Sequence, residues 1–432
     1  MNQTLFVIPH DWLQGWPLAA WLVFSIVAIL FTMRKEGVKG AVTNFGPLVL
    51  IVAAVIYFVV PRLEILDLNL RDPLGDMIPS GLAVRGYGVF LMLAILSSVA
   101  LVVIRSMQVG FNVERMISLC FGIIICGIIG ARVFYVVQKW EEFGFTTSSE
   151  LIVGLLDMTK GGLVVYGGVF GGMIAVGVFL WRTKMPARLT LDVLAPAFLI
   201  GLAIGRIGCL MNGCCYGGVC SEQFPFGLKF PVGSPPYIQQ LEQGQLLGLN
   251  GHFDESDDNL FIVDEVREHG LIAQRGLPIT TGDKIRIEYP ASIYMQAVKS
   301  GLITLPLKIR IEREADGSTF SVPLEQIPSW SLPIHPTQIY ATISAGLLCA
   351  VLWFYFPFRS FDGQLFALVL ILYPISRYFE EIVRDDEHGV FGTPLTISQW
   401  TSLVLLVIGI GLFAGFKNAG RNSKSVLPGG PG

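Results

Sequence analysis

Nine long apolar segments constrain the fold of this chain more than any other feature of its sequence. They cover residues 17–33, 45–60, 84–104, 116–137, 161–181, 191–211, 338–356, 363–382 and 396–416. A helix needs about 20 apolar residues to cross roughly 30 Å of hydrocarbon, and all but the second segment have close to this length. The sequence therefore predicts an all-α polytopic membrane protein with about nine transmembrane helices.

The composition excludes the other broad classes of protein. Of the 432 residues, 53% are hydrophobic and only 15% are charged, whereas an ordinary soluble domain has about 25% charged residues. The net charge of -3 provides no basic field that would attract nucleic acid. Seven cysteines are too few for a disulfide-scaffold protein.

Basic residues in the short loops predict the orientation. One alternating set of loops contains twelve lysines and arginines, and the other set contains five. The positive-inside rule places the richer set in the cytoplasm. We expect a multi-pass protein of the cell inner (cytoplasmic) membrane, with its N-terminus outside and its C-terminus in the cytoplasm. The first basic residue, Arg34, follows the first apolar segment, which is unlike a cleavable signal peptide.

A polar stretch at residues 217–334 interrupts the membrane pattern on the outer side. Residues 260–266, 284–288, 307–314 and 318–324 are rich in β-branched side chains, and turn signals precede two of these runs. We expect a small β-containing extracytoplasmic insert here. Part of it, residues 261–285, loosely resembles a PDZ domain.

The sixth apolar segment carries an arginine among glycines. A charged residue at a helix centre costs about 2.5–3.5 kcal/mol on insertion scales, so Arg206 needs a reason to be there. It either snorkels to the interface or offers its five N–H donors to an anionic oxygen cluster. Glycines 201, 205 and 208 share one helix face, where another backbone or a lipid can approach closely.

The eighth segment ends in charged residues on a shared face. Arg377 and Glu381 lie four residues apart, and Arg384 extends the same face by one turn. The structural interpretation is an ion pair that lets one helix carry both charges. The functional interpretation is an arginine held by a carboxylate so that it can receive a phosphate.

Three further patterns stay open on residue chemistry alone. Six glycines in residues 161–172 fit either close helix packing or anion binding at a helix start. His335, before a proline at a helix entry, is either an interfacial side chain or a base. Cys209, Cys214, Cys215 and Cys220 do not have the paired spacing of a zinc site, so we expect no metal, and either small-residue packing or a disulfide.

At these residues the sequence resembles the prolipoprotein diacylglyceryl transferase family. The matching motifs follow one another in the family's order, at residues 85–88, 130–132, 161–172, 205–213, 224–227, 230–231, 335–340 and 373–386. The resemblance implies that the chain moves a diacylglyceryl group from phosphatidylglycerol to the lipobox cysteine in the signal peptide of a preprolipoprotein. It implies no metal or organic cofactor, and its partners are these substrates and membrane lipids, with no nucleic acid.

The resemblance also implies a division of the chain. Residues 1–82 are two additional N-terminal transmembrane helices, 83–216 and 335–416 are the two parts of a seven-helix transferase body, 217–334 are the insert, and 417–432 are a cytoplasmic tail.

Family positions assign roles to particular residues. The implied catalytic residues are Arg206, Arg377, Tyr166 and Glu381. The implied substrate-binding residues are Tyr87, Arg132, Gly167, Gly168, Asn212, His335, Tyr373 and Arg384.

This chain departs from the family at three of its positions. The family's usual histidine in the glycine-rich block is Tyr166 here, and an asparagine and a glutamate of its signature are Cys209 and Cys214. Other functions therefore stay open: an anionic-lipid or solute transporter, a redox or metal protein built on the cysteines, or an inactive scaffold.

Overall fold

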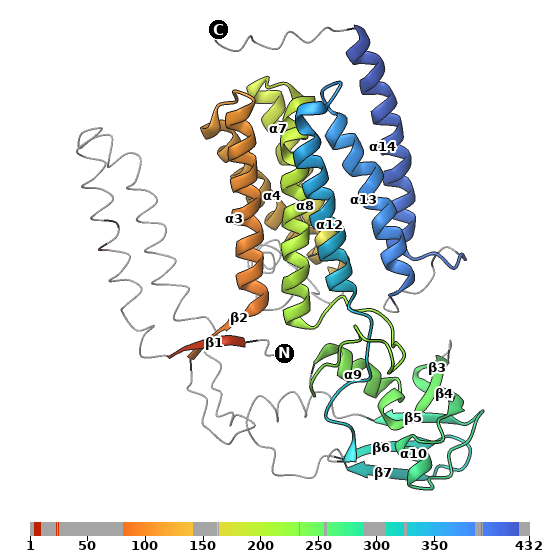
Figure 1. Cartoon of the computed structure of the whole chain (residues 1–432). Coiled ribbons are helices and arrows are strands. Elements are labelled where there is room, and N and C mark those ends of the chain that lie inside the picture. The colour runs from red at the N-terminus through yellow and green to blue at the C-terminus, as the bar shows by residue number, and fades with distance from the viewer. Residues whose placement is uncertain are drawn as a thin grey trace. The chain divides into compact units, whose positions relative to one another are not determined.

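A computed structural model describes residues 4–9, 23, 25, 81–140, 162, 164–232, 234–254, 257–288, 308–323, 326–384, 390 and 392–422. The chain forms two compact units (Figure 1). One comprises residues 1–89 and 208–336, and the other residues 90–207 and 337–432.

Seven long helices account for most of the described residues. They are α3 (Gly86–Gln108), α4 (Val113–Gln138), α7 (Val165–Thr183), α8 (Ala187–Asn212), α12 (Thr337–Tyr355), α13 (Gln364–Ile382) and α14 (Ile397–Asn422). Each of them coincides with an apolar segment expected from the sequence. Among the described residues, six helices are long and apolar enough to cross a membrane. The protein is therefore a mostly helical, polytopic membrane protein.

The exact number of spans stays a prediction. Helix α13 is not among the six because it carries three charged residues, Arg377, Glu380 and Glu381, near its end. The expected spans at 17–33 and 45–60 lie outside the described residues, apart from the helical positions Val23 and Ser25.

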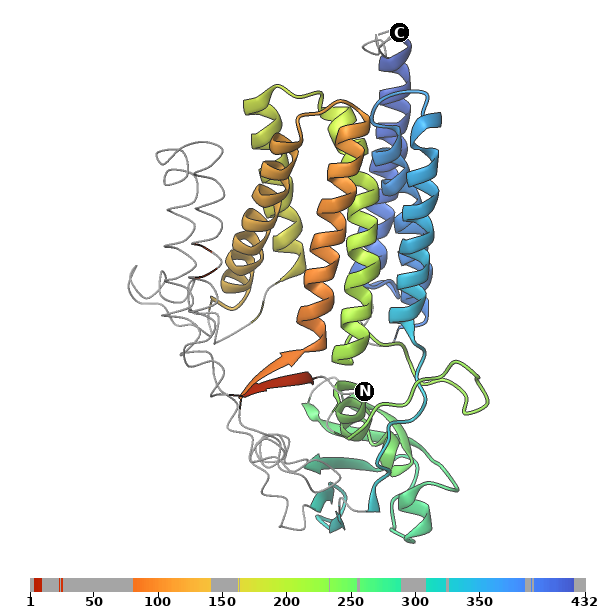
Figure 2. The same cartoon turned by 60° about the vertical axis from the view of Figure 1, so that its left-hand side comes forward.

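Helix α8 is the most buried of the six apolar helices, because 39% of its most apolar 18-residue stretch is buried. Figures 1 and 2 both show it between α3 and α12. The hydroxyl of Ser98 on α3 donates to the carbonyl of Ala197 at 2.8 Å, and that of Thr342 on α12 donates to the carbonyl of Ala203 at 3.2 Å. These contacts tie α8 to both of its neighbours.

Helices α4 and α7 cross through glycines. A Cβ atom at Gly167 would lie 2.4 Å from the carbonyl oxygen of Gly130, and one at Gly171 would lie 2.0 Å from the carbonyl oxygen of Cys126. Only glycine permits this approach of two backbones. The packing interpretation of the glycine-rich block is therefore confirmed at Gly167 and Gly171.

Helices α13 and α14 approach each other at a proline. Pro374 lies inside α13 and has no N–H, so the carbonyl of Leu370 lacks its usual helical donor. Gly409 of α14 lies against this carbonyl, and a Cβ atom there would be 2.8 Å from its oxygen. A helix defect and a glycine thus face each other across this contact.

The other unit contains a five-stranded antiparallel sheet in chain order. Its strands are β3 (Leu249–Asp254), β4 (Asp257–Val266), β5 (Lys284–Glu288), β6 (Lys308–Arg313) and β7 (Thr319–Pro323). The same unit contains the short helices α9 (Pro235–Glu242) and α10 (Leu271–Gln274). The core of this unit includes Tyr237, Leu241, Phe261, Ile272, Ile285 and Ile311, each at most 1% exposed.

All four strands expected from the sequence in this stretch are confirmed as β4 to β7. Strand β3 was not expected. A second, two-stranded sheet in the same unit pairs β1 (Thr4–Pro9) with β2 (Gly81–Arg85), the segment that leads into α3.

Candidate active site

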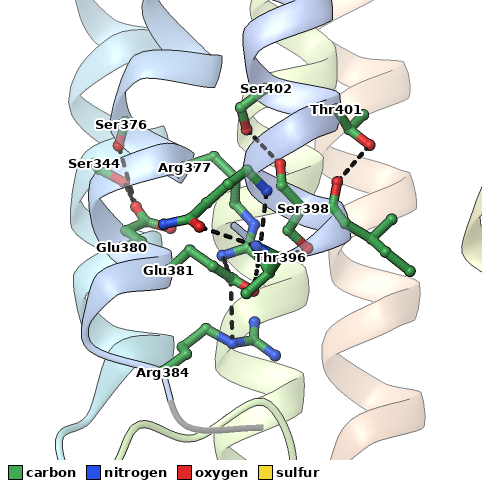
Figure 3. Close-up of polar contacts among 12 residues, drawn as sticks. Ser344, Ser376, Arg377, Glu380, Glu381, Arg384, Thr396, Ser398, Thr401 and Ser402 are labelled. Atoms are coloured by element: carbon green, nitrogen blue, oxygen red, sulfur yellow. Dashed lines mark hydrogen bonds and ion pairs between the residues drawn. The ribbon is translucent and has the colours of Figure 1, made fainter. Parts of the chain in front are cut away.

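A buried cluster of charges lies at the end of α13 (Figure 3). The Nη1 atom of Arg377 is 2.5 Å from Oε2 of Glu381, and Nε of Arg384 is 3.6 Å from the same oxygen. The side chain of Glu381 is 1% exposed, and those of Arg377 and Arg384 are 14% and 8% exposed. The ion pair expected from the spacing along this helix is confirmed, and Arg384 joins it.

Two hydroxyl groups at the start of α14 complete the cluster. Thr396 donates to Oε1 of Glu381 at 3.2 Å, and Nη2 of Arg377 donates to the hydroxyl of Ser398 at 3.2 Å. Both hydroxyl groups are labelled in Figure 3. Glu381 therefore has a partner for each carboxylate oxygen, and Arg377 is held from two helices. Sequence reasoning missed both Thr396, the residue just before α14, and Ser398 in its first turn.

The neighbouring carboxylate of Glu380 has its own partners. Ser344 of α12 donates to it at 2.5 Å and Ser376 donates at 3.1 Å. Glu380 thus occupies a separate hydrogen-bonded position. The group formed by Arg377, Glu381 and Arg384 carries two positive charges and one negative charge. Two guanidinium groups thus share one buried carboxylate, and guanidinium groups held in this way can receive an anion such as a phosphate.

Arg206, the other expected catalytic arginine, lies on α8 in the same unit as Arg377 and is partly buried. Of the glycines expected to form a close-packing face beside it, Gly201 meets this expectation. A Cβ atom there would lie 2.8 Å from the hydroxyl of Ser98. At Gly205, a Cβ atom would meet no described heavy atom within 4 Å other than its chain neighbours and the backbone of its own helix, so close packing is not confirmed there.

Arg132 and Tyr166 lie where α4 meets the start of α7. Arg132 is 3% exposed, donates to the carbonyl of Gly162 at 3.3 Å and lies 5.3 Å from the ring centre of Tyr135. It therefore holds the glycine-rich segment against α4. Tyr166, in the first turn of α7, is 43% exposed. Of the two glycines expected to bind substrate, Gly167 faces the backbone of α4, and a Cβ atom at Gly168 would have only ordinary contacts, at 3.5 Å or more.

The remaining expected residues occupy other positions. On α13, the ring of Tyr373 packs edge-on against Phe198, with ring centres 6.3 Å apart. In the unit that contains the sheet, Tyr87 lies at the start of α3, and Asn212 is the last residue of α8. His335 exchanges backbone hydrogen bonds with Gly217 and Gly218, and its ring centre is 5.0 Å from that of Phe224.

The structure brings three thiols together, although the sequence spacing predicts no metal site. The sulfur atoms of Cys209, Cys214 and Cys215 all lie within 4.8 Å of one another. All seven cysteines lie in the described part of the chain and carry thiols there.

Comparison with known proteins decides the family. The family model described as prolipoprotein diacylglyceryl transferase matches residues 77–414. The chain belongs to this family. The matched segment includes six of the seven long helices in full, α14 as far as residue 414, and every residue of the charged cluster.

Individual members of the family agree with this assignment. A protein of Rhodopirellula baltica named phosphatidylglycerol–prolipoprotein diacylglyceryl transferase is 35% identical, over 100% of this chain and 92% of its own length. Proteins with the same name from Bdellovibrio bacteriovorus and Clostridium tetani are 26% and 24% identical. They align with 78% and 77% of this chain and with 91% and 93% of their own lengths. The first alignment thus includes the N-terminal residues and the sheet.

Proposed function

We propose that this protein transfers the diacylglyceryl group of phosphatidylglycerol to the lipobox cysteine of preprolipoproteins, the first step of bacterial lipoprotein maturation. The observation that carries the proposal is the buried cluster of Arg377, Glu381 and Arg384 within the family-matched segment. Transfer needs a cationic group near the phosphate, inside the membrane-spanning part of the protein. This cluster supplies one.

The reaction is a displacement at carbon. The cysteine sulfur forms a bond to the glycerol carbon of the diacylglyceryl group, the bond from that carbon to the phosphate oxygen breaks, and glycerol 1-phosphate leaves with the electron pair. The thiol proton passes to water or to the departing phosphate. Because the thiolate is the reactive form, nearby guanidinium groups favour the reaction by lowering the pKa of the substrate thiol.

The residues divide this work among them. Arg377 and Arg206 stabilise the charge that grows on the departing phosphate. Glu381 orients Arg377, and Ser398 fixes the other end of the same guanidinium group. Tyr166, at the position of the family's usual histidine, donates a hydrogen bond to a lipid oxygen.

Other substrate-binding roles follow the family positions. We assign them to Tyr87, Arg132, Gly168, Asn212, His335, Tyr373 and Arg384. For Gly167 we propose an indirect role, in which its contact with α4 sets the position of Tyr166.

We further propose how the chain lies in the membrane. It has nine spans in the inner membrane, with its N-terminus outside, its C-terminus in the cytoplasm and the stretch 217–334 on the outer side. The excess of basic residues in one set of loops supports this orientation. We also propose the domain boundaries that the sequence predicts, at residues 82, 216, 334 and 416.

The decisive experiment measures transfer directly. Purified protein is incubated with phosphatidylglycerol vesicles and a lipobox peptide, and mass spectrometry detects the added diacylglyceryl mass. We expect Arg377→Ala or Arg206→Ala to reduce the rate by roughly 10²–10³-fold, the usual effect of removing one positioned electrostatic group. Lysine should rescue poorly at either position because the two-pronged guanidinium is lost.

Arg115→Ala is the matched control, because Arg115 is an exposed arginine at the start of α4. It should leave transfer unchanged. Movement of the lipid without a covalent product would overturn the proposal in favour of a transporter. Full activity of either alanine variant would remove that arginine from the mechanism.

A further inference from the structure

The three clustered thiols belong to the end of α8 and to the turn that follows it. Cys209 lies in the last turn of the helix, while Cys214 and Cys215 come just after its final residue, Asn212. All three side chains are partly buried. The transfer reaction proposed above uses none of them.

The helix end explains why the thiols meet. The N–H of Gly213 donates to the carbonyl of Leu210 at 3.2 Å, and the N–H of Cys214 donates to the carbonyl of Cys209 at 3.1 Å. Gly213 has φ +71°, so the chain ends its helix with a Schellman motif. This motif brings together the side chains of the residues that occupy the positions of Cys209 and Cys214.

The third thiol belongs to Cys215, whose backbone conformation is strained. Cys215 has φ +57°, in the left-handed region that costs a residue other than glycine about 1–3 kcal/mol. The thiol of Cys214 donates to the carbonyl of Cys209 at 3.7 Å. The backbone thus holds three sulfur atoms around one point.

The size of the cluster suits a metal ion. With a metal–sulfur distance of about 2.3 Å, sulfur atoms in trigonal or tetrahedral coordination lie roughly 3.8–4.0 Å apart. All three pairs of sulfur atoms here lie within 4.8 Å. Thiolates are soft ligands that select Zn²⁺, Cd²⁺ or Cu⁺, whereas Mg²⁺ and Ca²⁺ prefer oxygen.

We propose that Cys209, Cys214 and Cys215 together bind one thiophilic d¹⁰ metal ion, with Zn²⁺ as the representative. Binding of a divalent ion releases the three thiol protons and leaves a site of net charge minus one, and water completes the coordination. The ion would fix the turn after α8 to the end of the helix. This role is separate from the displacement reaction and requires no oxidant or reductant.

Spectroscopy of the metal itself provides the test. The full chain is purified metal-free under reducing conditions and titrated with Cd²⁺, whose thiolate complexes absorb in the near ultraviolet. X-ray absorption of the Zn²⁺-loaded protein then counts the sulfur ligands. We expect saturation at one ion per chain, three sulfur ligands at about 2.3 Å, and the loss of one sulfur ligand in both Cys209→Ser and Cys214→Ser.

Cys220→Ser is the matched control. Cys220 lies five residues after Cys215 but outside the group of three, so this variant should keep the full spectrum. Coordination by oxygen and nitrogen alone, or identical spectra in Cys214→Ser and the unchanged protein, would overturn the proposal and leave the thiols as packing groups.

A second measurement needs no variant that has to fold. The Zn²⁺-loaded protein and the metal-free protein are labelled with a maleimide and digested, and the labelled cysteines are identified by mass spectrometry. Zn²⁺ should protect Cys209, Cys214 and Cys215 while Cys220 reacts equally in both samples. Equal labelling of all four cysteines with and without Zn²⁺ would contradict the assignment.

Discussion

Arg377 and Glu381 lie one turn apart on α13, and their charged groups meet at 2.5 Å where the carboxylate is 1% exposed. A buried ion pair contributes little net stability unless its remaining atoms are also satisfied. Here Ser398 of α14 and Thr396, the residue just before that helix, satisfy one group each. Contacts from two segments therefore fix the orientation of the Arg377 guanidinium group. The members of the cluster can be tested separately.

Removal of the carboxylate charge should be costly. In Glu381→Gln, the buried guanidinium group of Arg377 loses the carboxylate charge that it meets at 2.5 Å, and breaking such a pair typically costs about 3–5 kcal/mol. We expect a loss of this order in the free energy of unfolding, measured by denaturant titration in detergent, together with reduced transfer. Glu380→Gln is the control, since Glu380 contacts only serine hydroxyls among the interactions described above. Equal losses in both variants would contradict a special role for Glu381.

The hydroxyl of Thr396 should contribute more to the free energy of unfolding than the volume of its side chain does. Thr396→Val keeps the volume but leaves one oxygen of buried Glu381 without its donor, which should cost about 1–3 kcal/mol of unfolding free energy. Thr401→Val, five residues after Thr396, removes a hydroxyl that donates to the backbone carbonyl of Ile397, at a partly buried residue. That variant should change stability by less than about 0.5 kcal/mol. An unchanged Thr396→Val protein would mean that water replaces the hydroxyl.

A single methyl group added at Gly167, where α4 and α7 cross, should destabilise the protein. Gly167→Ala would place a carbon 2.4 Å from the carbonyl oxygen of Gly130, so the helices must separate. We expect a loss of about 1–3 kcal/mol, as for other overpacked sites. Gly177 lies on the same helix, and a Cβ atom there meets no described heavy atom within 4 Å other than its chain neighbours and the backbone of its own helix. The stability of Gly177→Ala should be equal or slightly higher, and thermal denaturation of both variants compares them directly.

The sheet should lose an ion pair in acid. Burial raises the pKa of Asp283, but hydrogen bonds from Arg313 and Thr280 outweigh this effect and hold the pKa below its usual value. A depressed folded-state pKa stabilises the fold above the unfolded-state pKa, near 3.9, and this stabilisation is lost as the pH falls through the folded-state value.

Hydrogen exchange of strand β5, measured over this pH range and corrected for intrinsic rates, checks that expectation. Protection in the unchanged protein should fall on acidification, and Asp283→Asn should already have low protection at neutral pH. Asp264→Asn is the control, because the pair of Asp264 with His252 is more than half exposed. A pH profile that Asp283→Asn leaves unchanged would count against the ion pair as its cause.

The sequence predicts this fold well where local periodicity decides it. Long apolar runs identify seven helices, and β-branched runs identify four strands. Strand β3 escapes because Asn250, Gly251 and His252 are weak strand formers. Pairing with β4 holds them extended, although the register shifts between Asn250 and Gly251 and again after Phe253. The pairing of Arg377 with Glu381 follows from helix geometry alone.

The missed parts of the site depend on contacts between distant segments. Nothing in the spacing of residues along α13 indicates that Thr396 and Ser398, at the start of another helix, reach its charges. The cysteine cluster escapes for a different reason. Its spacing matches no familiar ligand pattern, and only the turn at Gly213 and Cys215 brings the three sulfur atoms together.

The contact between Leu370 and Gly409 also limits how the charged cluster can move. A shift of α14 by one residue relative to α13 would need a rotation of about 100° to restore the same face. It would bring a residue bulkier than Gly409 against the carbonyl of Leu370. Leu370 lies about two turns before Arg377 on α13, so this contact sets the position along α13 at which Ser398 of α14 meets the arginine. Any rearrangement that admits a lipid headgroup must therefore carry α13 and α14 together as one body.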